Sequence, residues 1–325
     1  MRILITGGAG YIGSHVVKAL GKLGHEITVY DNLSTGFREA VTFGELVVGD
    51  VADKEKLDKL MGEKKFEAVL HFAGSIVVPE SVSDPIRYYQ NNTINSHGLI
   101  SLCHKNKINK FIFSSTAAIY GMVEDGVCRE RTPIAPLNPY GWSKYMTELM
   151  LKDTSAAFPD FKYVALRYFN VSGADPEGQI GQSFPAATHL IKAACEAACG
   201  KREKLQLFGT DYPTTDGTCE RDYIHVTDLA SAHASALDYL VQGGKSDAFN
   251  CGYGHGYSVR QVIDLVKEVT GVDFKVDELP RRAGDASSLI ANSDKLRKAT
   301  TWTPKHNDLR TIIKTAYEWE IKRPY

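Results

Sequence analysis

The sequence begins with an apolar segment, Arg2–Thr6, that leads directly into a glycine-rich turn, Gly7-Gly8-Ala9-Gly10-Tyr11-Ile12-Gly13. Glycines at positions 7, 10 and 13 would let the turn close, let the backbone approach a phosphate and let the next helix pack on the strand. Free N–H groups at the start of such a helix bind a dinucleotide pyrophosphate. The spacing is GxxGxxG, one residue longer than the commonest GxGxxG fingerprint. The segment therefore predicts a dinucleotide-binding strand–turn–helix unit.

An acidic residue ends the next predicted strand. Residues 27–30 form that strand, and Asp31 follows it 18 residues after Gly13. A carboxylate at this place binds both hydroxyls of the adenosine ribose. The nearest following basic residue is Arg38, so no lysine or arginine lies close enough after Asp31 to bind the 2′-phosphate of NADP. We therefore expect NAD rather than NADP.

Predicted strands and helices alternate through the first half of the chain. Further strands are expected at 45–48, 68–70, 110–113 and 163–166, and helices near 53, over 85–104 and from 139 past 151. This pattern predicts an α/β fold with a doubly wound, Rossmann-like parallel sheet covered on both faces. Ligands gather at the carboxyl ends of such strands, which here carry Gly7, Asp31, Asp50, Ala73, Ser114 and Arg167.

The alternation stops at about residue 170. Segments 170–178 and 209–217 are rich in glycine, proline and aspartate, which predicts loops that line a cleft. Helices are expected again at 186–198, 226–241, 259–269 and 309–320. We expect an NAD-binding domain over 1–170 and a smaller substrate-binding lobe over 171–325, with some segments of the lobe returning to the first domain.

Composition narrows the class of protein. A net charge of −1 gives no reason to expect a nucleic acid partner. No apolar run reaches the roughly 18 residues of a membrane span, and the first residues form a predicted core strand rather than a signal peptide. The six cysteines show neither a disulfide framework nor metal-ligand spacing. We expect a cytoplasmic protein without a metal or a membrane partner.

The segment Tyr140-Gly-Trp-Ser-Lys144 follows Asn138-Pro139 at a predicted helix start. Tyr140 and Lys144 would then lie one turn apart on one face. A lysine ammonium beside a phenol lowers the phenol pKa from about 10 and makes it a proton acceptor near neutral pH. The alternative is an exposed tyrosine beside a solvated lysine. The spacing occurs once among sixteen tyrosines, at the place where such a fold needs it, so we favour a catalytic pair.

These features, with the strand end Ser114-Ser115-Thr116, resemble the extended short-chain dehydrogenase/reductase superfamily. Segments between residue 1 and about 320 are closer still to its UDP-glucose 4-epimerase family. They are YDNL at 30–33, HFAG at 71–74, PESV at 79–82, LRYFN at 166–170, DYPTTDGT at 211–218, RDYIHV at 221–226 and RRAGD at 281–285.

The resemblance implies reversible C4 epimerisation of a UDP-hexose, UDP-galactose to UDP-glucose, through a 4-keto sugar and tightly held NAD. Tyr140 would remove the C4 hydroxyl proton, and Lys144 would bind the nicotinamide ribose and tune Tyr140. Thr116 would place its hydroxyl beside the reacting oxygen, where many members have serine. The family also implies a homodimer.

The resemblance implies two sets of binding residues. Those for NAD are Gly7, Gly10, Tyr11, Ile12, Gly13, Asp31, Asn32, Asp50, Val51, Phe72, Ala73, Asn91, Tyr140, Lys144 and Tyr168. Those for the UDP-sugar are Thr116, Asn170, His189, Phe208, Arg221, Tyr223, Arg282, Asp285 and Leu289. Guanidinium groups at 221 and 282 suit a diphosphate, although surface ion pairs are the alternative. Phe208 would stack on uracil or belong to the core, and His189 would contact substrate or be structural.

Two positions depart from the family pattern. Ile76 stands where some members have a lysine near the nicotinamide ribose, so Lys144 would have more to do. Leu289 occupies the position that limits sugar size, a bulky tyrosine in some members and a small residue in others. Whether N-acetylated sugars fit is left open by the sequence.

Other functions share much of this pattern. A 4,6-dehydratase or decarboxylase needs a second acid after the strand-end hydroxyl, but Ala117-Ala118 follow Thr116. A 4-epimerase of UDP-pentoses, UDP-uronic acids or UDP-N-acetylhexosamines would use the same catalytic pair. A non-catalytic NAD-sensing protein is the alternative from another class, and the intact Tyr140/Lys144 pair argues against it.

Overall fold

Seven parallel strands form the central sheet of the computed structural model, which describes residues 1–185, 188–282 and 285–325. Their order across the sheet is β12-β7-β5-β4-β1-β2-β3. Their bounds are β1 (Arg2–Thr6), β2 (Glu26–Asp31), β3 (Glu45–Val48), β4 (Ala68–His71), β5 (Lys110–Thr116), β7 (Lys162–Tyr168) and β12 (Asp247–Cys251). The predicted α/β class with a doubly wound parallel sheet is confirmed.

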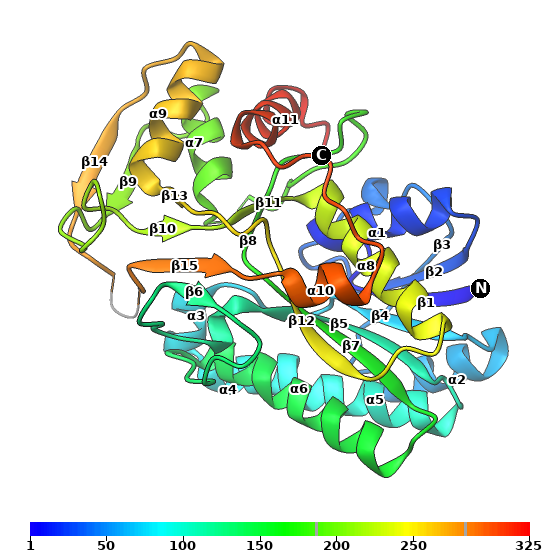
Figure 1. Ribbon diagram of the computed structural model, residues 1–325. Helices are drawn as coiled ribbons and strands as arrows, with labels where there is room; N and C mark the ends of the chain where they lie inside the picture. The colour runs from blue at the N-terminus through cyan, green and yellow to red at the C-terminus, as the bar shows by residue number, and fades with distance from the viewer. Residues whose placement is uncertain (186–187, 283–284) are drawn as a thin grey trace.

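Helices cover both faces of the sheet, as Figure 1 shows. One face carries α1 (Tyr11–Lys22) and α8 (Val226–Val241), and the other carries α2 (Lys54–Lys64), α5 (Asn95–Lys105) and α6 (Pro139–Ala157). Strands enclosed on both faces need continuous apolar runs rather than alternation. The run Ile3-Leu4-Ile5 meets this need, because all three side chains are fully buried.

The stretch predicted as one helix over 85–104 is divided into three. Two α-helices, α4 (Pro85–Tyr88) and α5, flank a π-helical segment, η2 (Tyr89–Ile94). π-helical turns are rare and often occur at functional sites. Here the segment carries Asn91 and Asn92, and the side chain of Asn92 bonds to the loop after β4 through the N–H of Ser75 at 2.8 Å. Periodicity alone does not reveal such a local widening of the helix.

Helix α6 begins where predicted. The side chain of Asn138 accepts a hydrogen bond from the N–H of Gly141 at 2.9 Å, and Pro139 occupies the first turn. Asparagine at the cap and proline just inside it are both favoured at helix starts. This cap fixes the position of Tyr140 within the first turn.

The second half of the chain forms smaller sheets and further helices. Strand β8 (Asn170–Ser172) pairs with β11 (Tyr223–His225), and β9 (Leu205–Phe208) pairs with β14 (Val276–Leu279). A four-stranded sheet has the order β13 (Tyr257–Ser258), β10 (Glu220–Arg221), β15 (Ser288–Ala291), β6 (Val127–Cys128). The other elements are α3 (Val78–Ser83), α7 (Leu190–Ala198), α9 (Val259–Thr270), α10 (Asp294–Ala299), α11 (Leu309–Lys322), η1 (Arg38–Ala40) and η3 (Ala117–Ile119).

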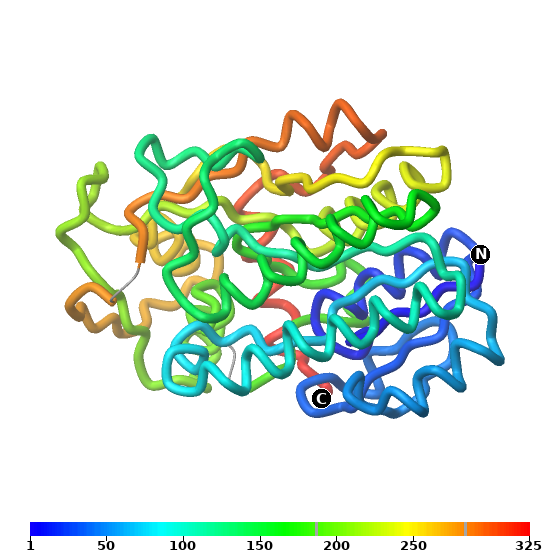
Figure 2. The backbone as a smooth tube through the Cα atoms, turned by 90° about the horizontal axis from the view of Figure 1, so that it is seen from below, coloured from blue at the N-terminus to red at the C-terminus, as the bar shows by residue number. Residues whose placement is uncertain are grey.

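Two segments cross between the halves of the chain. Strand β12 comes from the second half and extends the central sheet beside β7, whereas β6 comes from the first half and pairs with β15. The helix predicted over 186–198 begins at Leu190, and its first two expected residues, 186 and 187, lie outside the described part of the chain. Seen from below in Figure 2, α5 and α6 run side by side across the lower face.

Candidate active site

The turn between β1 and α1 is built around close backbone contacts. Gly7 has a φ of +72°, and a Cβ there would lie 2.4 Å from the nitrogen of Ala73. A Cβ on Gly13 would lie 2.2 Å from the carbonyl oxygen of Gly7. Helix α1 starts at Gly10 without a side-chain cap, so the N–H groups of its first turn are available to an anion. The turn therefore fits a dinucleotide pyrophosphate.

The acidic group expected to bind ribose lies beside this turn. The Asp31 carboxylate accepts hydrogen bonds from the N–H groups of Ala9 (3.0 Å) and Leu33 (2.8 Å). Burial raises the pKa of Asp31, and these two N–H groups oppose the rise. Nearby, Asn32 donates to the carboxylate of Asp50 at 2.7 Å, which brings both predicted adenosine contacts to the ends of β2 and β3. Val51, the next predicted contact, is buried.

The loop after β4 lies on the other side of the turn. The N–H groups of Phe72 and Ala73 both donate to the carbonyl oxygen of Thr6. Asn91 donates to the hydroxyl of Ser75 at 2.9 Å, so this predicted residue reaches the same loop. Its neighbour Asn92, which the sequence interpretation missed, ties the loop to α6 by donating to the hydroxyl of Ser143 at 3.0 Å. No spacing or motif marks Asn92 in the sequence.

The predicted catalytic residues meet between α6 and the end of β5. Tyr140 lies close enough to Thr116 for the hydroxyl of Thr116 to lower the pKa of its phenol. The Thr116 hydroxyl oxygen accepts from the N–H of Ala118 at 3.1 Å, which leaves its own hydrogen free to donate. One turn along α6, the Nζ of Lys144 donates to the carbonyl oxygen of Ser114 at 3.0 Å. Tyr140, Lys144 and Thr116 thus form one cluster.

The electrostatics of this cluster differ in one respect from the expectation. Burial raises the pKa of Tyr140, and the hydroxyl of Thr116 opposes that rise. Burial also lowers the pKa of Lys144 to about 8. Tyr140 therefore has a raised pKa where the sequence predicted a lowered one, because desolvation is the largest influence on both groups.

Tyr168 closes the opposite side of the cluster. Its hydroxyl forms a short hydrogen bond with the hydroxyl of Ser114. The ring of His233, on α8, lies between Tyr168 and Phe72, with centroid distances of 6.1 and 4.9 Å. His233 is fully buried and was not identified from the sequence, where a histidine on an apolar helix carries no specific signal. Phe72 and Tyr168, both predicted to bind the cofactor, thus contact the same histidine.

The predicted nucleotide-sugar residues come together in pairs. Asn170 is the register partner of Tyr223, and Arg221 is the register partner of Leu289. The guanidinium carbon of Arg282 lies 3.7 Å from the centroid of the Phe208 ring. The backbone of Asp222 connects the first two pairs, because its carbonyl accepts from Asn170 (3.0 Å) and its N–H donates to Leu289 (3.2 Å).

Some predicted residues are placed less simply. Tyr223 is almost completely buried, so any contact it makes is from within the core. Tyr11 donates from its hydroxyl to the carbonyl of Gly173 at 2.6 Å and so ties α1 to the second half of the chain. The N–H of Asp285 is directed at the carbonyl of Arg282, 3.4 Å away, and Ile12 packs on the main core.

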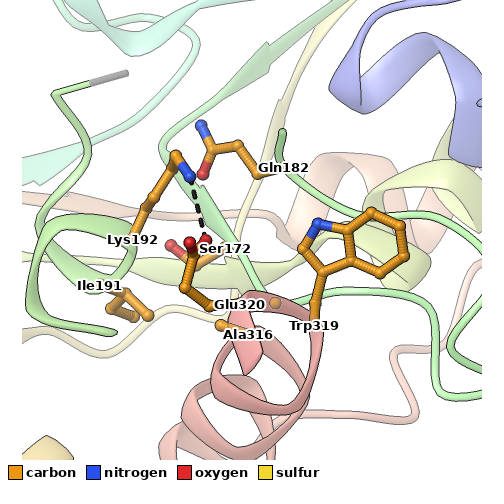
Figure 3. A pocket seen from close by; sticks show the side chains of 8 residues that line it. Ser172, Gln182, Ile191, Lys192, Ala316, Trp319 and Glu320 are labelled. Atoms are coloured by element: carbon orange, nitrogen blue, oxygen red, sulfur yellow. Dashed lines mark hydrogen bonds and ion pairs between the residues drawn. The ribbon is translucent and has the colours of Figure 1, made fainter. Parts of the chain in front are cut away.

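His189 immediately precedes helix α7. Its Nδ1 bonds with the side-chain amide of Gln182 at 2.9 Å, which favours the structural alternative. Gln182 also lines a small cavity between α7 and α11, together with Lys192 and the indole of Trp319 (Figure 3). This cavity contains none of the Tyr140 cluster. Within the described residues, no group of three histidine, cysteine or carboxylate side chains could hold a metal ion.

Comparison with known proteins gives a consistent result. Residues 3–252 match the NAD dependent epimerase/dehydratase family. A UDP-glucose 4-epimerase of Azospirillum brasilense is 52% identical over 98% of this chain and 92% of its own length. The solved UDP-Glc/GlcNAc 4-epimerase of Campylobacter jejuni is 52% identical with a TM-score of 0.87, and a UDP-glucose 4-epimerase of Brucella ovis in complex with NAD is 42% identical with a TM-score of 0.95. Both structures match over 98% of each chain.

Proposed function

The chain belongs to the NAD dependent epimerase/dehydratase family. We propose that Tyr140, Thr116 and Lys144 carry out the reaction of this chain. That reaction is the reversible C4 epimerisation that interconverts UDP-galactose and UDP-glucose, with NAD as cofactor. The observation that carries the assignment of residues is the position of Tyr140 and Lys144, one turn apart on α6, against Thr116 and Ser114 at the end of β5.

Tyr140 acts as the general base. It removes the proton of the C4 hydroxyl and returns it once the 4-keto sugar has turned over, so the cycle consumes no acid or base. Thr116 would place its hydroxyl beside the reacting oxygen and the phenol of Tyr140, and the N–H of Ala118 holds the Thr116 hydroxyl oxygen in place. Bound NAD supplies the acceptor and donor of the C4 hydrogen. Ala117 and Ala118 offer no second acid, which disfavours elimination.

The residues that would hold NAD follow the carboxyl edge of the sheet. The uncapped start of α1 and the glycines at 7 and 13 suit the pyrophosphate, and the carboxylate of Asp31 suits the adenosine ribose. Lys144, whose Nζ lies near Gly74, would bind the nicotinamide ribose. Phe72 and Tyr168 would flank the nicotinamide, supported by their common contact with His233.

The UDP group is assigned to the second half of the chain. Arg221 and Arg282 would bind the diphosphate through planar guanidinium forks. Phe208 would stack on uracil, and Asn170, Tyr223 and Asp285 would complete the nucleotide site. The register pairs Asn170/Tyr223 and Arg221/Leu289 support this grouping.

We assign UDP-N-acetylhexosamines as a second substrate class. Leu289, half-buried on β15 beside Arg221, is smaller than the tyrosine that would restrict the sugar pocket. The relative from Campylobacter jejuni, 52% identical, is described as acting on both UDP-Glc and UDP-GlcNAc.

One assay tests both assignments. Purified protein is incubated without added cofactor with UDP-galactose, UDP-N-acetylgalactosamine or UDP-arabinose, and products are identified by NMR. We expect conversion of the first two, and UDP-glucose as the product of UDP-galactose. Activity that requires added NAD would contradict only tight cofactor retention. No conversion of any sugar with NAD present would contradict the proposed roles and favour an NAD-binding sensor.

A homodimer is supported by an apolar surface on α4, η2 and α6. Ile86 is 80% exposed, and Ile94, Trp142, Met146 and Leu149 are also exposed. Trp142, Met146 and Leu149 follow helical i, i+4, i+7 spacing and so share one face of α6. We propose that a second copy covers this face. Analytical ultracentrifugation should show a dimer for the natural protein and a monomer for Met146→Glu.

Two further assignments remain proposals. Residues 1–170 would form the NAD-binding domain and 171–325 the UDP-sugar lobe, with β12 returning to the central sheet. A cytoplasmic location is supported by six unpaired cysteines. None of the helices that the structure describes is long and apolar enough to cross a membrane.

A further inference from the structure

Three successive turns of α6 contact the end of β5. Tyr140 lies beside Thr116, Lys144 donates to the carbonyl of Ser114, and Glu148 accepts from the hydroxyl of Ser115 at 2.5 Å. The three α6 residues are spaced by four, which places them on one face of the helix. The first two contacts belong to the cluster proposed to act on the sugar. The third has no part in that chemistry.

Glu148 is held by a buried arginine. The Nε of Arg167 lies 3.0 and 3.1 Å from the two carboxylate oxygens of Glu148, and its Nη2 lies 2.6 Å from one of them. The two side chains are only 9% and 5% exposed. Arg167 is the register partner of Ser115 and immediately precedes Tyr168. The ion pair therefore joins β5, β7 and α6 directly behind the cluster.

The same network continues toward the UDP-sugar side. Arg167 donates to the hydroxyl of Tyr120 at 2.9 Å, which donates to the side chain of Asn250 at 2.6 Å. The amide of Asn250 donates to the carbonyl of Cys128 at 2.9 Å. Cys128 is paired with β15, the strand that carries Leu289. Buried hydrogen bonds thus connect the base-bearing helix with the strand at the sugar pocket.

Stability alone does not account for such an arrangement. Desolvation offsets much of the attraction within a buried ion pair, so apolar replacements of similar size are often as stable or more so. The fork of a guanidinium fixes direction as well as distance, which an apolar contact does not. What the pair supplies here is geometry: it sets the separation of α6 from the ends of β5 and β7.

We infer that Arg167 and Glu148 are positioning residues, which hold Tyr140 in line with Thr116 and thereby determine the rate of epimerisation but not the affinity for the UDP-sugar. This inference rests on the proposed function. Neither residue is among those proposed to contact the sugar or NAD. Replacement of the Arg167 guanidinium by a lysine ammonium, or of both charged side chains by apolar ones, should therefore lower kcat while KM changes little.

The test compares Arg167→Lys with the double replacement Glu148→Leu/Arg167→Met. The double variant guards against misfolding, because it removes both buried charges together. We expect kcat for UDP-galactose to fall ~10- to 100-fold in both, as for a small misplacement of a reacting group. KM should stay within about twofold, NAD should remain bound and the double variant should melt near the natural protein. Glu320→Gln is the matched control, since Glu320 is a buried partner of Lys192 and Lys201 remote from the cluster, and its kcat should be unchanged.

A stable double variant with natural kcat would overturn the inference, as would an equal loss of kcat in Glu320→Gln. Crystal structures of the natural protein and Arg167→Lys give a readout independent of activity. We expect the distance between the Tyr140 and Thr116 hydroxyl oxygens to lengthen in the variant. An unchanged distance would overturn the positioning role, whether or not the natural protein converts a UDP-sugar. A natural protein that converts no UDP-sugar would contradict the proposed function instead.

Discussion

Lys144 donates a hydrogen bond from its Nζ to the carbonyl oxygen of Ser114 at 3.0 Å, and it does so from a buried position. The bond fixes the ammonium one turn from Tyr140 and two residues from Thr116 along β5. Burial lowers the pKa of Lys144 to about 8. The cation proposed to bind the nicotinamide ribose therefore loses its proton closer to neutrality than an exposed lysine.

This shift predicts a pH dependence of stability. Between about pH 8 and the unperturbed value near 10.5, the folded state binds fewer protons at Lys144 than the unfolded state. Its contribution to the free energy of unfolding should therefore rise with pH in that window, by at most about 1.4 kcal/mol per pH unit. Urea unfolding of the natural protein and Lys144→Met between pH 8 and 10 measures the difference in slope. Parallel curves would contradict the lowered pKa.

Four buried histidines predict a loss of stability at acidic pH. Burial lowers the pKa of His15 and His233 to about 4 and that of His71 and His225 to about 3. Below about pH 6.5 the imidazoles bind protons in the unfolded chain but not yet in the folded one. The free energy of unfolding should therefore decrease as the pH is lowered, by about 1.4 kcal/mol per pH unit for each histidine. Urea unfolding at pH 7, 6 and 5 tests this, with His233→Gln expected to reduce the slope by one histidine. Constant stability between pH 7 and 5 would refute it.

Replacement of Tyr140 by phenylalanine removes the proposed base and keeps the ring. We expect kcat to fall by ~10³-fold or more, with NAD still bound and the melting temperature nearly unchanged. Tyr239→Phe is the matched control, since the hydroxyl of Tyr239 accepts a hydrogen bond from the N–H of Lys245 in the turn after α8. Near-natural turnover by Tyr140→Phe would remove Tyr140 from its role.

The role of Thr116 depends on one hydroxyl. Thr116→Val keeps the shape of the side chain but loses the hydroxyl beside Tyr140, and we expect kcat to fall ~10²-fold. Thr116→Ser keeps the hydroxyl and should remain within a few-fold of the natural rate. Steady-state kinetics with UDP-galactose compares the two. Equal rates for the valine and serine variants would mean that the hydroxyl takes no part.

The two adjacent arginines after β14 should behave differently. Arg282 lies over Phe208, whereas Arg281 pairs with Asp211 at 2.6 Å and lies over Tyr212. We expect Arg282→Ala to weaken binding of UDP about 10- to 100-fold, the worth of one hydrogen-bonded charge, without loss of folding. Arg281→Ala should change binding little. Isothermal titration calorimetry with UDP measures both, and indistinguishable affinities would place Arg282 outside the site.

The local sequence was sufficient for several of the individual elements. The glycine-rich turn, the Asn138-Pro139 helix start and the strand ends that carry Asp31 and Thr116 follow from residue preferences that act within a few positions. The Tyr140/Lys144 spacing likewise needs only helical periodicity. Resemblance to a family then supplied the UDP-sugar residues, which no local pattern distinguishes from surface arginines or core aromatics.

Other features depended on contacts between distant parts of the chain. The rise in the pKa of Tyr140, against the expected fall, results from burial by surrounding elements, and desolvation is invisible in the sequence around residues 140–144. The Glu148–Arg167 pair joins residues from α6 and β7 whose partnership has no short-range signal. The sequence by itself predicted the residues that are proposed to carry the chemistry and the elements that hold them. Only the tertiary structure decided their protonation and mutual alignment, because both depend on what the folded chain removes from water and brings within hydrogen-bond distance.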